Sequence, residues 1–96
     1  MAMIRVTPDL LEAKAAEVRS LKAEHDEVMA KMTALVHALD EIWQGEAQTA
    51  FVAKFDGMQS TFTNFSEMLD NYATMMDTSA KTLREADESL KAAIGN

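Results

Sequence analysis

The sequence predicts an all-α protein: a two-helix antiparallel hairpin that dimerises into a four-helix bundle. Apolar residues recur at alternating steps of three and four, which is the spacing of one helical face. The 96 residues include only three Gly and one Pro, and β-branched residues are sparse beside Ala, Leu, Met, Glu and Lys. The apolar spacing breaks only at residues 42–47, near the middle of the chain, so two long helices are expected.

The first helix is expected over about residues 8–43. Thr7 suits the N-cap, and Pro8 suits the first helical position because its missing N–H has no partner there. Asp9 complements the positive end of the helix dipole. The seam expected to face the second helix, interrupted only by His25, consists of Val18, Leu21, Val28, Met32, Leu35, Leu39 and Ile42.

The second helix is expected to be unbroken over about residues 46–93, although Gly57 lies within it. Gly45 is expected to end the first helix, because glycine adopts left-handed conformations without steric cost. The Trp-x-Gly turn at residues 43–45 would then join the two helices in one domain covering residues 1–96. The expected seam of the second helix resembles that of a coiled coil and consists of Phe51, Phe55, Met58, Phe62, Phe65, Leu69, Tyr72, Met76, Ser79, Leu83, Ala86, Leu90 and Ala93.

A second apolar stripe predicts self-association. Two helices alone are too thin to cover both stripes, and each fully buried apolar side chain contributes ~1.5–3 kcal/mol against a domain stability of ~5–15 kcal/mol. Two hairpins packed antiparallel would cover this surface in a homodimeric four-helix bundle. The residues expected at the dimer interface are Met29, Val36, Met68 and Met75.

Composition and charge argue against several function classes. A net charge of −7 argues against a nucleic-acid partner, and the absence of Cys forbids a disulfide or a thiolate metal site. No phosphate-binding loop or nucleophile–His–acid order is visible, so no catalysis, cofactor or small-molecule substrate is expected. The N-terminus lacks the features of a conventional signal peptide, and no run approaches the ~18 apolar residues of a membrane span.

The two histidines each have two interpretations. His37, Asp40 and Glu41 have the spacing of ligands on one helical face, but a solvated face is favoured and no metal is expected. His25 lies in the expected seam, where a hydrogen-bonded core histidine is favoured over a pH switch.

Trp43-Gln44-Gly45, placed at mid-chain between two long amphipathic helices, resembles the turn of the WXG family of small proteins exported by bacterial type VII secretion systems. The Thr7-Pro8 helix start, Ala47 and Phe51 after the turn, and the long second helix extend this resemblance over the whole chain.

The end of the chain carries a second motif of that family. Members from low-GC Gram-positive bacteria tend to have an apolar residue, an acid and two further apolar residues, at the spacing of Leu83, Asp87, Leu90 and Ile94. On a helix these four residues share one face. The mycobacterial branch has a Tyr followed four residues later by an acid. Here Met76 follows Tyr72 at that spacing, so the resemblance favours the homodimeric branch.

The resemblance implies synthesis in the cytoplasm and export, as a folded homodimer, through a complex driven by a type VII secretion ATPase. It implies a composite export signal, with Trp43 and Gly45 from one subunit and Leu83, Asp87, Leu90 and Ile94 from the other. The exported protein would be a helical interaction module or a virulence or competition factor, possible partners including a larger co-secreted protein.

Two alternatives stay open. A cytoplasmic adaptor or chaperone would pair with a larger type VII toxin, and a heteromeric complex found only in cytosol would favour it. A membrane-active effector would release its helices onto lipid at acid pH, but the mixed polar face without a basic stripe counts against it.

Overall fold

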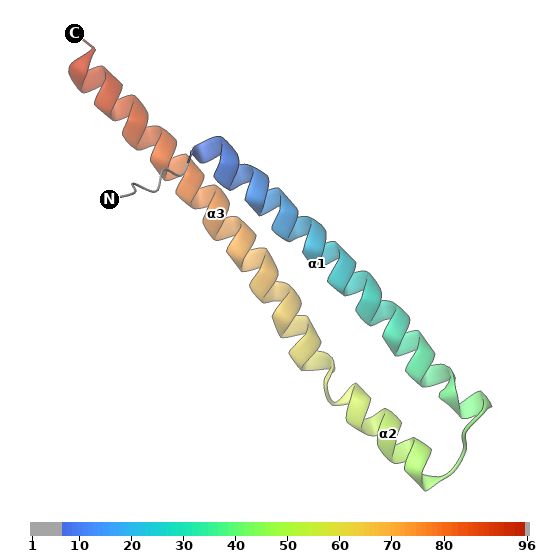
Figure 1. Ribbon diagram of the computed structural model, residues 1–96. Helices are drawn as coiled ribbons and strands as arrows, with labels where there is room; N and C mark the ends of the chain where they lie inside the picture. Colours follow the sequence, from blue (N-terminus) through green and yellow to red (C-terminus); the bar gives the residue numbers. More distant parts are fainter. Residues whose placement is uncertain (1–6, 96) are drawn as a thin grey trace, which may run out of the picture. The chain divides into compact units, whose positions relative to one another are not determined.

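The chain folds into helices and short turns in this computed structural model, which describes residues 7–95 (Figure 1). Its elements are α1 (Pro8–His37), the 3-10 helix η1 (Ala38–Glu41), α2 (Glu46–Asp56) and α3 (Gln59–Ile94). Over the described residues there is no strand, and the all-α prediction is confirmed. None of the helices in this part of the chain is both long and apolar enough to cross a bilayer.

The helices pack within two compact units, Met1–Ser20 with Leu69–Asn96, and Leu21–Met68. In each unit, a part of α1 lies antiparallel to a part of the second arm. In the first unit, Asp9 pairs with Arg84, whereas Arg19, further along α1, pairs with the earlier residue Asp77 at 2.7 Å. Partner numbers fall as α1 numbers rise, which is the signature of an antiparallel pair.

The second unit shows the same order. Asp26 bonds to Ser66, Thr33 to Gln59 at 3.2 Å, and His37 to Asp56 at 2.6 Å. The predicted two-helix antiparallel hairpin is confirmed.

The start of α1 is capped by Thr7, as predicted. The Thr7 hydroxyl accepts a hydrogen bond from the Leu10 backbone N–H at 3.2 Å, and the Thr7 carbonyl accepts one from the Leu11 N–H at 3.0 Å. These bonds satisfy two of the backbone donors that every helix leaves free at its first turn.

The first helix ends earlier than the expected residue 43. The α-helix stops at His37 and tightens into η1, after which the backbone N–H groups of Ile42 and Trp43 both donate to the Leu39 carbonyl, at 3.0 and 2.8 Å. A 3-10 turn is a common way to finish an α-helix, and its spacing of about three residues keeps the apolar pattern going. The apolar periodicity therefore extended the prediction past the true end.

The expectation of an unbroken second helix is also wrong. The arm ends one helix at Asp56 and starts the next at Gln59, with Gly57 and Met58 between them. Glycine lowers helix propensity by ~1 kcal/mol relative to alanine. The break is small: the Gly57 N–H still reaches the Ala53 carbonyl at 2.9 Å, and the rings of Phe55 and Phe62 pack across it, with centroids 5.8 Å apart. The apolar spacing runs through it undisturbed.

Small residues fill the core of the first unit. Ala15 on α1 and Ala73 and Ala80 on α3 are fully buried, which allows the two helices to approach closely. In the second unit the most buried large side chain is Val36, which is 1% exposed. Half-buried side chains complete the inner faces at helical spacing: Val18, His25, Met29 and Thr33 on α1, Phe55 on α2, and Gln59, Phe62, Ser66, Leu69 and Met76 on α3.

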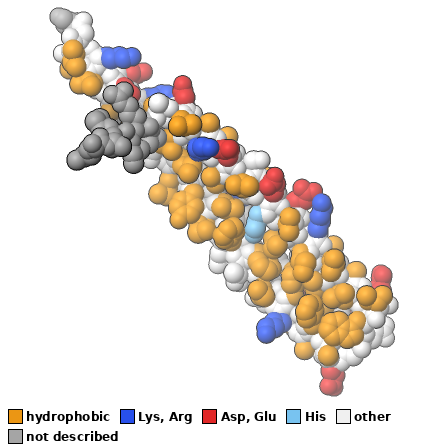
Figure 2. All heavy atoms as spheres, viewed as in Figure 1, with side chains coloured by type: hydrophobic (Ala, Val, Ile, Leu, Met, Phe, Trp, Pro, Cys, Tyr) orange, Lys and Arg blue, Asp and Glu red, His pale blue; other side chains and the backbone are white. Residues whose placement is uncertain are grey.

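Most of the seam expected on the first helix faces outward instead, although Val18 and Leu39 are half-buried. Leu21 and Val28 are each 56% exposed and Leu35 is 58% exposed. Both stripes have helical periodicity, so spacing alone does not tell which of them faces the partner arm. The face of α1 that packs against the second arm includes small and polar residues such as Ala15, His25 and Thr33. The bulkier residues Leu21, Val28 and Leu35 are left on the surface. Figure 2 shows hydrophobic side chains over much of the visible face of α2 and the adjoining start of α3.

Candidate interaction surface

Each arm of the hairpin carries an exposed apolar stripe, here called its outer stripe. Its members recur every seven residues, which is the repeat that places side chains along the seam of a coiled coil. Contiguous apolar surface of this kind marks a contact with another protein or a membrane. The outer stripes consist of Leu21, Val28, Leu35 and Ile42 in the first arm, and of Phe51, Met58, Phe65 and Tyr72, flanked by Met68 and Met75, in the second.

The four residues expected at a dimer interface divide between the surface and the core. Met68 and Met75 are 40% and 61% exposed and flank the outer stripe. Met29 is half-buried against the second arm. The assignment of Val36 is wrong, because this side chain is buried inside the hairpin and offers no surface to a second chain.

The turn residues position an exposed indole next to α2. Trp43 is 39% exposed, and its ring centroid lies 5.7 Å from that of Phe51. Gly45 has φ 128° and ψ 179°, a conformation that is essentially restricted to glycine. The expectation that Gly45 ends the first helix is wrong, because Gly45 is the N-cap of α2. Its carbonyl accepts hydrogen bonds from Thr49 N–H at 3.1 Å and from Thr49 Oγ1 at 3.2 Å.

The C-terminal motif lies on one exposed face of α3. Leu83, Leu90 and Ile94 are 37%, 58% and 71% exposed, and Asp87 is also exposed. One helix, Gln59–Ile94, carries all four residues, so their spacing places them on the same side. This motif and the Trp-x-Gly turn belong to different compact units of the chain.

Arg84 links this part of α3 to the start of α1 through ion pairs. Its Nη2 donates to Asp9 Oδ1 at 2.5 Å and to Glu12 Oε1. The hydrogen bonds to Glu12 and then to Asp9 raise the pKa of the Arg84 guanidinium. Figure 1 shows that α3 continues beyond the start of α1, and this continuation carries the last residues of the motif.

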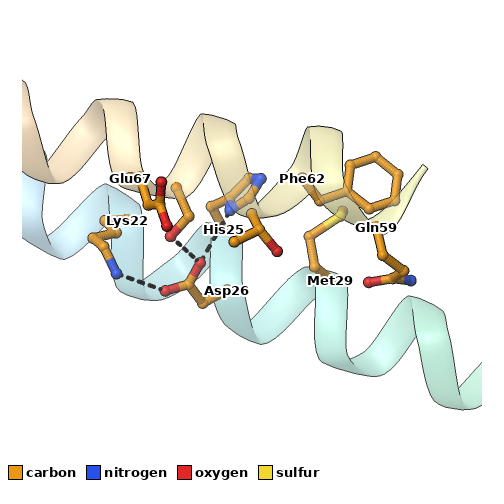
Figure 3. Close-up of a pocket in the computed structure, with 9 residues that line it drawn as sticks. Lys22, His25, Asp26, Met29, Gln59, Phe62 and Glu67 are labelled. Carbon is orange, nitrogen blue, oxygen red and sulfur yellow. Dashed lines mark hydrogen bonds and ion pairs between the residues drawn. The ribbon is translucent and has the colours of Figure 1, made fainter. Parts of the chain in front are cut away.

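A polar cluster joins the arms in the second unit (Figure 3). Asp26 accepts hydrogen bonds from Ser66 Oγ at 2.6 Å and from Lys22 Nζ at 3.0 Å, and its other close neighbour is His25 Nδ1 at 3.2 Å. These hydrogen bonds, Ser66 first, lower the pKa of Asp26 to about 2. The cluster borders a hollow of about 310 Å³ that is also lined by Gln59 and other residues of both arms.

Both histidines contact carboxylates. His25, with 20% of its side chain exposed, lies between Asp26 and the ring of Phe65, whose centroid is 5.1 Å away. His37 pairs with Asp56 across the arms rather than forming a site with Asp40 and Glu41. No group of three or more His, Cys, Asp or Glu within residues 7–95 is arranged to hold a metal ion.

An apolar hollow of about 200 Å³, which the sequence did not indicate, lies beside α2 and the residues that follow it. It is lined by Phe51, Lys54, Phe55 and Met58. The related sequence feature is the seven-residue spacing of Phe51 and Met58, which the apolar periodicity assigns to the inner seam together with Phe55.

The family model described as "WXG100: Proteins of 100 residues with WXG" matches residues 3–88, which include the Trp-x-Gly turn. The chain belongs to the WXG100 family. Its relatives include the protein YukE of Bacillus subtilis, 25% identical over 92% of this chain and 91% of the relative. The type VII secretion system extracellular protein A of Staphylococcus aureus is 26% identical over 94% of this chain and 93% of the relative.

Solved structures of similar proteins have the same fold. EsxA of Geobacillus thermodenitrificans matches with a TM-score of 0.80 and 23% identity, covering 94% of this chain and 97% of the other. The secreted protein EsxB of Bacillus anthracis matches with a TM-score of 0.78 and 23% identity, covering 91% and 99%. Family membership and the names of these relatives identify this WXG100 chain as a small type VII secretion protein.

Proposed function

We propose that this WXG100 protein is exported as a homodimer by a type VII secretion system and acts outside the cell as a helical interaction module. Its function would depend on two surfaces rather than on a catalytic centre. The outer stripes would bind a second copy of the chain, and the C-terminal face of α3 would be recognised by the secretion ATPase. The carrying observation is the outer stripe of the second arm, where Phe51, Met58, Phe65 and Tyr72 are 45–50% exposed.

The exposed apolar area explains why a second chain is needed. A fully buried side chain of this size contributes ~1.5–3 kcal/mol, so covering several of them adds a stability comparable with that of the whole domain. A second hairpin supplies a surface of the same chemistry, and closed two-fold pairs are the commonest oligomers. Export as a dimer would keep these stripes out of water before and during transport.

The export signal proposed from the family resemblance fits the accessible positions. Trp43 and Gly45 shape the exposed turn, and Leu83, Asp87, Leu90 and Ile94 present one acid among apolar groups on α3. The secretion ATPase is the proposed reader of these residues. We expect export without a cleavable signal peptide, so the exported chain should keep the N-terminal sequence of the intracellular chain.

The test is export in the source bacterium. An epitope-tagged chain should appear in the culture supernatant of a strain with an intact secretion ATPase and be absent from the supernatant when that ATPase is deleted. A cytoplasmic marker protein controls for lysis, and mass spectrometry compares the N-termini of the two pools. Equal amounts in both supernatants would contradict export by this system. A chain confined to cytosol in complex with a larger toxin would point to an adaptor instead.

A further inference from the structure

The exposed apolar surface of the second arm contains three methionine sulfur atoms. Met58 lies in the outer stripe and is 45% exposed, and the flanking Met68 and Met75 are 40% and 61% exposed. Because the chain has eight methionines and no cysteine, thioethers are its only sulfur groups. An oxidant has to reach the sulfur atom, so exposed methionines react before covered ones. These three thioethers are therefore open to oxidation in a single chain.

Two neighbouring methionines of α3 differ in their exposure. Met75 is exposed, whereas Met76 is half-buried, and so is Met29 on α1. Successive residues of an α-helix point about 100° apart, so Met75 faces outward while Met76 belongs to the inner face of the hairpin. The chain thus contains two thioethers that are adjacent in sequence and differ in their access to an oxidant.

Oxidation would change the chemistry of the apolar surface. Hydrogen peroxide transfers one oxygen atom to the thioether sulfur: the O–O bond breaks, an S–O bond forms, the sulfur loses two electrons, and the second oxygen leaves as water. The product is a polar sulfoxide, whose oxygen accepts hydrogen bonds. Burial of such a group without a donor is unfavourable, and the neighbouring rings of Phe51 and Phe65 have no donor. A stripe that carries sulfoxides is therefore a poorer surface for another apolar face.

We propose that hydrogen peroxide oxidises Met58, Met68 and Met75 in the single chain and thereby prevents it from pairing with a second copy. This inference rests on the self-association proposed above and adds a chemical regulation to it. A second copy would cover the three sulfur atoms, so the dimer is protected and the oxidant reacts with dissociated chains. The C-terminal face of α3 takes no part in this reaction and stays accessible to the secretion ATPase.

Peptide mass spectrometry after limited treatment with hydrogen peroxide tests the modification itself. In chains diluted until they are monomeric, Met75 should be oxidised at least about threefold faster than Met76. Raising the chain concentration until dimers form should slow the oxidation of Met75 and leave that of Met76 nearly unchanged. Equal rates at the two residues in the dilute chain would overturn the inference. A Met75 rate that is the same in monomers and dimers would also overturn it.

Sedimentation equilibrium of the oxidised chain tests the effect on pairing. Oxidation of the three methionines should raise the dimer dissociation constant at least about tenfold, while circular dichroism shows that the helices are kept. Treatment with methionine sulfoxide reductases should restore the original constant, because these enzymes return the sulfoxide to the thioether. Oxidised chains that pair as tightly as untreated chains would overturn the inference and leave the proposed homodimer standing.

Leucine variants identify the methionines that are responsible. Leucine is apolar, similar in volume to methionine and not oxidised by peroxide. In the triple variant Met58→Leu, Met68→Leu and Met75→Leu, peroxide should change the dissociation constant by less than about twofold. The control variant, Met29→Leu with Met76→Leu, has the same change on the inner faces and should respond to peroxide as the unmodified chain does.

The remaining outcomes separate the two proposals. Dissociation of the oxidised triple variant would assign the effect to other methionines and overturn this inference. Untreated chains that sediment as monomers at all concentrations would overturn the self-association proposal and this inference with it.

Discussion

The Oδ1 atom of Asp26 accepts a hydrogen bond from Ser66 Oγ at 2.6 Å and so joins α1 to α3 within the unit Leu21–Met68. Ser66 is the largest cause of the lowered pKa of Asp26, ahead of Lys22 and His25. The folded chain therefore holds this carboxylate in its charged form at a lower pH than the unfolded chain does.

This difference in pKa predicts a pH dependence of stability. The Asp26 contribution to the free energy of unfolding should be complete above about pH 5 and should decline as the pH falls from about 4 toward about 2. Ser66→Ala removes the largest cause, so its stability should depend less on pH in this window than that of the unchanged chain. Urea unfolding at pH 3 and pH 6 measures both slopes. Equal slopes would show that the Ser66 bond does not control the titration of Asp26.

Gly45 and Gly57 should respond oppositely to substitution. Gly45→Val places a β-branched residue at φ 128° and should destabilise the fold by ~1–3 kcal/mol. The cause would be backbone strain rather than a steric clash, because no atom lies within 4 Å of the added Cβ. Gly57 has helical φ and ψ values of −65° and −16°, which alanine adopts without strain, so Gly57→Ala should stabilise the fold by ~0.4–1 kcal/mol. Thermal melts of both variants provide the comparison. A neutral Gly45→Val variant would show that the turn relaxes without cost.

The alanine core of the first unit should reject larger side chains. Ala73→Leu adds volume where the helices touch and should lower the free energy of unfolding by ~1–3 kcal/mol. Ala86→Leu makes the same change at an exposed position of α3 and should stay within ~0.5 kcal/mol of the original. Denaturant unfolding of the two variants measures this difference. Matching values would mean that Ala73 is not at a tight helix contact.

Asp87→Asn should separate export from folding. The change removes one exposed charge with little change in volume, so stability should shift by less than ~0.5 kcal/mol. The amount of protein in the culture supernatant should fall while the cellular pool stays at least as large. Immunoblots of the two fractions measure this, with circular dichroism as the folding control. Normal export of the folded variant would remove Asp87 from the proposed signal.

The sequence was sufficient to predict the all-α hairpin and the Thr7 cap, but not the residues at which the helices end. Thr7 caps α1, Gly45 has positive φ, and the arms run antiparallel. The orientation of the first helix was wrong, because Val28 and Val36 lie on stripes of equal periodicity and only the paired structure separates them. The break at Gly57 was missed for a similar reason, since Phe55 and Phe62 keep the apolar spacing across it.

The candidate site was predicted in part. The motif from Leu83 to Ile94 was recognised as one face, and Met68 and Met75 are exposed where a second chain was expected. The hollow around Lys54 was missed, because periodicity placed its apolar neighbours in the core. A lysine bordering an exposed apolar patch has no sequence signal that distinguishes it from an ordinary surface lysine.

The outer stripe of the second arm is expected to bind a second copy of the chain. Met75, 61% exposed, should be replaceable by Glu without loss of fold, but a charge there should weaken association at least tenfold, since ~1.5–3 kcal/mol of burial is lost at each copy. Thr74→Glu, exposed and off the stripe, is the matched control and should leave association unchanged within a few-fold.

Sedimentation equilibrium of the unmodified chain at micromolar concentration measures whether it pairs with itself. A homodimer should have twice the 10.6 kDa mass of one chain, with little change between low and high salt, because the contact is apolar. The Met75→Glu chain should shift toward the mass of a single chain while keeping its helical circular dichroism. A stable mass of 10.6 kDa for the unmodified chain at these concentrations would contradict self-association through the outer stripe.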